Sequence, residues 1–133
     1  MSSYEYTEVD APPEAVVEAV RTELRSRGVT EYAVVDHGHD MAAAGATPHP
    51  AWTLIFGNPA AGEAVLAHEL AAAVDIPLRL AVIRAGGDVG RSTIVLRPLE
   101  SLLGPELAEV AARLSGALRA IAAAAARDAA QAD

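Results

Sequence analysis

Residues 52–70 read WTLIFGNPAAGEAVLAHEL and predict a strand that turns directly into a helix. The apolar and β-branched run at 52–56 is typical of a strand buried on both faces. Asn58 suits a helix N-cap, because its side-chain oxygen can accept a bond from a free backbone N–H in the first turn. Pro59 suits the first helical position, where its missing N–H costs nothing. We expect this strand–helix unit to be a core unit, with the helix start as a candidate anion site.

The part of the chain before this unit predicts two more strands and one helix. Val16, Val20 and Leu24 recur at helical spacing, and Gly28 follows as the expected C′ residue. The expected elements are a strand at 4–9, a helix at 13–27 and a strand at 31–36. Residues 37–51, HGHDMAAAGATPHPA, are the least regular segment, with no more than one helical turn expected in it.

The part after the central strand predicts a helix, a hairpin and a long final helix. The helix is expected at 59–74, since Leu66, Leu70 and Val74 recur at helical spacing. Alternating apolar residues around a Gly-Gly turn predict a hairpin of strands 78–85 and 91–96. An apolar stripe from Leu107 to Ile121 predicts the last helix, and the alanines of 122–126 sustain it while offering little to bury.

This order of elements predicts an α+β fold in a single two-layer domain. We expect a mainly antiparallel sheet of about five strands, with the helices at 13–27 and 59–74 packed on it. A doubly wound parallel sheet is the alternative, and the hairpin disfavours it. The domain is expected to cover residues 1–127, with residues 128–133 as a frayed C-terminal tail.

Composition excludes several function classes. The 133 residues include no cysteine and no lysine, which removes disulfides, thiolate nucleophiles, Cys-based zinc sites and Schiff-base catalysis. The formal charge of −8 argues against nucleic acid or an anionic membrane as a main partner, since both need a basic face. The N-terminus has neither a basic region nor an apolar run, so a cytoplasmic protein is expected.

One cluster has the residue types of a catalytic or metal site. Residues 36–40 read DHGHD, and on an extended backbone His37 and His39 could chelate one divalent cation with Asp40 or Asp36 as the carboxylate. If the protein is an enzyme, His37 is the expected base, oriented by Asp36 or Asp40. The competing interpretation is a strand-ending turn whose histidines are simply solvated.

A ligand site is expected where this cluster meets the central strand–helix turn. Strands two and three of such a sheet often lie close, so we expect His37 and His39 to lie near Gly57 and Asn58. Imidazoles titrate near neutrality, and the helix start supplies N–H donors. The expected ligand is a small polar molecule, with or without a divalent ion.

Several motifs together resemble the DUF302 family. They are Asp36-His37, the string at 52–59 reading WTLIFGNP with Gly62 after it, and the segment at 75–82 reading DIPLRLAV before a Gly-rich hairpin. The resemblance spans about residues 13–103. It implies a small, soluble α+β protein, often a compact dimer, and it transfers no catalytic residue because the family's function is undefined. Residues 96–99, LRPL, depart from the polar stretch usual in that place.

Three functions from different classes follow. Binding of a small ligand between the loop at 36–50 and the helix start at 58 ranks first. A structural or regulatory homodimer without chemistry ranks second, with the helix at 107–121 or a sheet edge at the interface. An isomerase- or cyclase-like enzyme using His/Asp acid–base chemistry ranks third.

Overall fold

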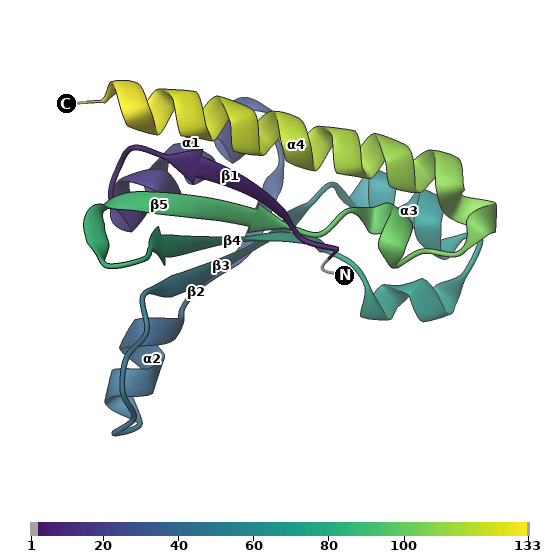
Figure 1. Cartoon of the computed structure of the whole chain (residues 1–133). Helices are drawn as coiled ribbons and strands as arrows, with labels where there is room; N and C mark the ends of the chain where they lie inside the picture. The colour runs from purple at the N-terminus through teal and green to yellow at the C-terminus, as the bar shows by residue number, and fades with distance from the viewer. Residues whose placement is uncertain (1–2, 133) are drawn as a thin grey trace.

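The computed structural model describes residues 3–132 and has five strands and four α-helices (Figure 1). The strands are β1 (Glu5–Val9), β2 (Thr30–Asp36), β3 (Ala51–Gly57), β4 (Leu78–Ala85) and β5 (Asp88–Leu96). The helices are α1 (Pro13–Ser26), α2 (His37–Ala43), α3 (Pro59–Leu66) and α4 (Ala108–Gln131). Short 3-10 turns lie at η1 (Leu70–Val74), η2 (Leu99–Ser101) and η3 (Pro105–Leu107).

The five strands form one sheet in the order β1-β5-β4-β3-β2, and every neighbouring pair is antiparallel. The predicted α+β class is therefore confirmed, and the parallel alternative is wrong. The β4–β5 hairpin turns at Gly86, whose positive φ of 55° favours glycine. In the β2–β3 pair Asp36 lies opposite Trp52, and Thr30 lies opposite Gly57. The end of β2 therefore lies beside the start of β3, and the start of β2 lies beside the end of β3.

The hydrophobic core lies between one face of the sheet and the helices α1 and α4. Alternate strand residues point to opposite faces, and those on the covered face are almost fully buried. The core contains Leu54, Phe56, Leu80, Val82 and Ile94 from the strands, Val16, Val20 and Leu24 from α1, and Leu118, Ile121 and Ala125 from α4. Figure 1 shows α4 running along the whole sheet beside α1. No helix within residues 3–132 is long and apolar enough to cross a membrane.

One face of the alanine-rich half of α4 is buried, although each alanine side chain offers little area to bury. Ala122, Ala125 and Ala129 are 1%, 0% and 4% exposed, and the helix continues to Gln131. The frayed tail predicted from residue 128 is thus wrong as far as Gln131. Alanine has the smallest side chain that still favours a helix, so α4 can approach α1 and the sheet closely. Apolar residues of the helix expected as a dimer interface, including Leu118 and Ile121, are thus buried within one chain.

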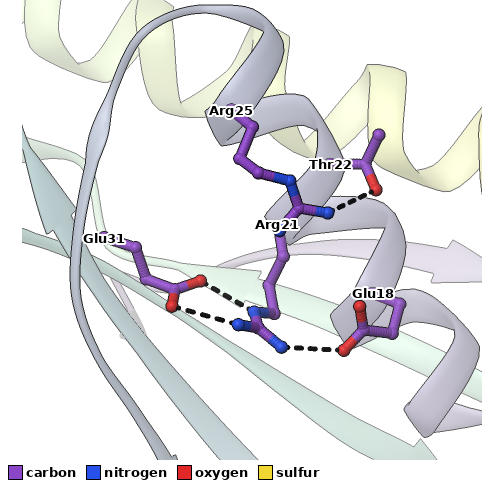
Figure 2. Close-up of polar contacts among 5 residues, drawn as sticks. All are labelled: Glu18, Arg21, Thr22, Arg25 and Glu31. Carbon is purple, nitrogen blue, oxygen red and sulfur yellow. Dashed lines mark hydrogen bonds and ion pairs between the residues drawn. The ribbon is translucent and has the colours of Figure 1, made fainter.

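A half-buried arginine joins α1 to the neighbouring edge strand β2 (Figure 2). Arg21 donates from Nε and Nη2 to the two carboxylate oxygens of Glu31, at 2.8 and 3.3 Å, and from Nη1 to Glu18 at 3.0 Å. A bidentate guanidinium–carboxylate pair sets orientation as well as distance. Arg21 therefore sets how α1 is oriented on β2.

The segment after β3 differs from the single helix predicted at 59–74. The α-helix ends at Leu66, and Glu69 caps the separate turn η1 by accepting a bond from Ala71 N at 3.1 Å. Val65 is completely buried in the core, whereas Leu70 and Val74 are 77% and 81% exposed. The break therefore turns the second half of the predicted apolar stripe toward solvent.

Candidate functional site

The four predicted ligand-binding residues lie at opposite ends of β3. His37 and His39 follow Asp36, which pairs with Trp52 near the start of β3, whereas Gly57 and Asn58 stand at its end. Adjacent antiparallel strands place the end of one beside the start of the other. At about 3.3 Å per residue, the two pairs are separated by roughly the full length of the strand. The expectation that they meet is wrong.

The histidine cluster is helical and does not have the geometry of a chelate. Residues two apart on a helix do not face each other, so His37 and His39 point in different directions. His37 Nε2 lies 2.7 Å from Thr53 Oγ1, and Asp36 Oδ1 accepts a bond from His39 N at 2.9 Å. Asp36 thus caps α2 and does not orient His37. Within residues 3–132, no three His, Asp or Glu side chains come together as a metal site.

Metal binding by His37, His39 and Asp40 stays a prediction that would require α2 to unwind. Packing within the arm formed by residues 37–50 explains why a glycine stands between the two histidines. A Cβ on Gly38 would lie 2.9 Å from the carbonyl oxygen of His49, because the returning chain runs directly against α2. None of the α2 residues is buried, and Figure 1 shows this arm projecting from the sheet.

The start of α3 is a capped helix end with few donors left for an anion. Asn58 Oδ1 accepts a bond from Ala60 N at 2.9 Å, as its sequence position predicted. Pro59 has no N–H, so the first two helical residues offer no free donor. A site built on backbone N–H groups alone is therefore weak here.

The end of β3 instead borders a cavity of about 890 Å³, which we call the α3 cleft. Its walls come from segments far apart in the chain. α3 and η1 form one wall with Ala61, Leu66 and Leu70, the strand ends add Phe56 and Leu78, and α4 adds Leu114, Ala117 and Ile121. Cavities of this size are typical of sites for small organic molecules.

The lining of the α3 cleft is mostly apolar, with three polar side chains. Its polar side chains are Tyr32, Asn58 and Glu63, and the other described lining residues are apolar or glycine. None of them is His, Ser, Thr or Arg, so no Ser–His or similar hydroxyl–imidazole pair lines the cleft. Tyr32 is 51% exposed, so it lies at the solvent-facing edge of the cleft.

Sequence reasoning found one part of this cleft and missed the rest. Gly57 and Asn58 line it, as the strand–helix motif suggested, but Tyr32 and Ala117 were not singled out. The apolar stripe of the last helix indicated that α4 faces a core. It gave no indication that Leu114 and Ala117 would be left partly uncovered beside α3.

Comparison with known proteins supports the fold. A family profile described as "Domain of unknown function DUF302" matches residues 5–125. The structure is similar to the crystal structure of an uncharacterized conserved DUF302 protein from Bacillus stearothermophilus, with a TM-score of 0.83 and 18% identity, covering 94% of this chain and 99% of that chain. No curated protein matches the chain significantly. The resemblance seen in the sequence is confirmed, and the chain belongs to the DUF302 family.

Proposed function

We propose that the protein binds a small, largely apolar molecule in the α3 cleft. The observation that carries the proposal is a cavity of about 890 Å³ whose lining is apolar except for Tyr32, Asn58 and Glu63. Burial of apolar surface is worth about 25 cal/mol per Å², so a molecule that fills such a cleft gains its affinity mainly from desolvation. The polar ligand expected from the sequence fits this lining poorly.

The few polar groups restrict the ligand further. Tyr32 and Asn58 can exchange hydrogen bonds with a hydroxyl, carbonyl or amide group. Glu63 and the net charge of −8 disfavour an anion at this position. The ligand class we propose is therefore a neutral apolar molecule with a polar group near one end.

The test uses N-phenyl-1-naphthylamine, a neutral apolar dye whose fluorescence rises when it leaves water. We compare Ala117→Phe, which fills the cleft from α4, with Ala120→Phe, which adds the same side chain outside the cleft on the same helix. Both residues are exposed, so both variants should fold. We expect saturable binding that Ala117→Phe weakens at least about tenfold, equivalent to about 1.4 kcal/mol, and that Ala120→Phe leaves unchanged. Equal binding by the two variants would overturn the proposal.

A homodimer is a second proposal, and its interface would differ from the one expected. The alanines of α4 are already buried within one chain. The neighbouring Leu70 and Val74 are 77% and 81% exposed, which favours η1 as a contact surface. A dimeric mass by light scattering that reverts to monomer in the Leu70→Ser/Val74→Ser variant would support it, and a monomer at tens of micromolar would contradict it. A cytoplasmic location remains part of the same proposal.

A further inference from the structure

A second groove runs over strand residues on the face opposite α1 and α4, including Tyr6, Ala81 and Val95, and reaches the core at Leu80 and Leu118. It has a volume of about 640 Å³, and its lining includes Tyr4, Tyr6, Arg79 and Arg97. We call it the Arg79 groove. It shares Pro77 and Leu78 with the α3 cleft but takes its aromatic and charged groups from β1, β4 and the end of β5. The two sites can therefore be altered independently.

The register of the sheet places two arginines side by side in this groove. Ala81 pairs with Val95 across β4 and β5, and Tyr6 pairs with Val95 across β1 and β5. Extending this register by two residues on the same face leads to Arg79 in β4, to Arg97 directly after β5 and to Tyr4 directly before β1, and all three line the groove. Neighbouring like charges repel each other, and an anion bound between the two arginines would relieve that repulsion.

The aromatic residues hold one arginine in place and leave the other available. Arg97 Nη2 donates to the Tyr4 hydroxyl at 3.2 Å, and its guanidinium carbon lies 5.0 Å from the centroid of the Tyr4 ring. The Tyr4 and Tyr6 rings meet edge to face at 6.4 Å. Arg79 is exposed and, within residues 3–132, makes no hydrogen bond or ion pair. Asp75 also lines the groove but forms no ion pair with either arginine within those residues.

Arg79 and Arg97 differ from the other arginines in lining the same groove, together with two tyrosines. Arg21, Arg27 and Arg119 each pair with a glutamate. Arg79 and Arg97 stand together without a carboxylate partner although the net charge is −8. A planar guanidinium matches the two oxygens of a carboxylate or phosphate, and tyrosine rings pack against aromatic ligands. We propose that the Arg79 groove binds a small aromatic anion, with its charged head between Arg79 and Arg97 and its ring against Tyr6.

The test is an NMR titration with phenyl phosphate and benzoate, using benzyl alcohol and inorganic phosphate as probes that lack either the charge or the ring. The variants are Arg79→Gln and, as the matched control, Arg113→Gln, which removes an exposed charge from α4. We expect the aromatic anions to shift the amide signals of residues 79–81 and 95–97. Arg79→Gln should weaken this binding at least about tenfold, and Arg113→Gln should leave it unchanged.

Three results would overturn the proposal. They are benzyl alcohol or inorganic phosphate binding as tightly as phenyl phosphate, an unchanged affinity in Arg79→Gln, or a dimer that dissociates in Arg79→Gln. The last result would show that acidic groups of a second copy occupy the groove. Ala117→Phe, which blocks the α3 cleft, should not affect the aromatic anions, so this proposal and the apolar ligand can fail separately.

Discussion

A helix with the same kind of side-chain cap stands at each end of β3, but only one of the two helices packs into the core. At one end Asp36 caps α2 by accepting from His39 N at 2.9 Å, and at the other Asn58 caps α3 by accepting from Ala60 N at 2.9 Å. Yet α2 buries none of its residues, whereas α3 buries Val65 completely and forms one wall of a large cleft. A cap therefore determines where a helix begins, and the apolar side chains that follow determine whether it joins the core.

The largest difference between the two ends should appear on truncation of one side chain in each helix. Val65→Ala removes two buried methyl groups and should lower the free energy of unfolding by about 2 kcal/mol. Met41→Ala in α2 should cost less than about 1 kcal/mol, because that helix lies outside the core. Urea denaturation of both variants measures the difference, and equal losses would mean that the arm contributes to the core after all.

Removal of the two caps should give the next largest effect. Asn58→Ala should cost about 1 kcal/mol of global stability, because α3 is part of the cooperative core. Asp36→Ala should leave global stability nearly unchanged and instead speed amide hydrogen exchange in residues 37–43. Hydrogen exchange monitored by NMR distinguishes a local from a global loss, and a global loss on Asp36→Ala would argue against an independent arm.

Replacing the glycine near each helix start by alanine should change stability in opposite directions. Gly62→Ala should stabilise the protein by roughly 0.5–1 kcal/mol, because alanine favours a helix and its Cβ would meet only Ile76 Cδ1, at 3.8 Å. Gly38→Ala should destabilise the arm, because its Cβ would lie 2.9 Å from the backbone oxygen of His49. Thermal denaturation checks the first and hydrogen exchange of residues 45–50 checks the second. Stabilisation in both would show that the arm can shift freely.

Lowering the pH should have the smallest effect on stability. It should act through contacts of α4, the helix that forms one wall of the α3 cleft. The hydrogen bonds from Arg119 lower the pKa of Glu5 from its usual value of 4.5, and they join β1 to α4, which walls the cleft. Ser115 on the same helix likewise lowers the pKa of Glu100 by a hydrogen bond. Because the folded state binds these protons less tightly, the stabilisation is complete above the unfolded pKa and is lost as pH falls through the lower folded value.

The measurement is a pH series of denaturation curves from neutral pH to pH 3 or so. The Glu5→Gln variant should lose part of the acid sensitivity, and Glu109→Gln on the exposed side of α4 serves as the control. An acid response identical in wild type and Glu5→Gln would contradict the assignment.

Most of the fold could be predicted because its signals are local. Alternating apolar residues at 78–85, the Gly-Gly turn and the Asn58-Pro59 step each depend on a few neighbouring residues. The helix α2 was missed because HGHDMAA contains a glycine and two histidines and lacks an apolar stripe. The break at 67–69 was missed because the spacing of Leu66, Leu70 and Val74 continues through it.

The candidate site was less predictable because it depends on which segments meet. Gly57 and Asn58 could be identified from their own motif, but Tyr32 and Ala117 join them only through the packing of β2 and α4. The error about His37 arose from treating adjacent strands as if both ended at the same edge. In an antiparallel pair they end at opposite edges.

We propose that a ligand binds at the α3 end of β3 and not at the α2 end. The most direct measurement is a titration of the ¹⁵N-labelled protein with indole, a small neutral apolar molecule, followed by two-dimensional NMR. The account predicts saturable shifts at the amides of Gly57, Ala61, Gly62 and Ala117, with residues 37–43 unchanged. The same titration of Ala117→Phe should give much smaller shifts. Shifts concentrated at residues 37–43, or none that saturate at the cleft, would contradict it.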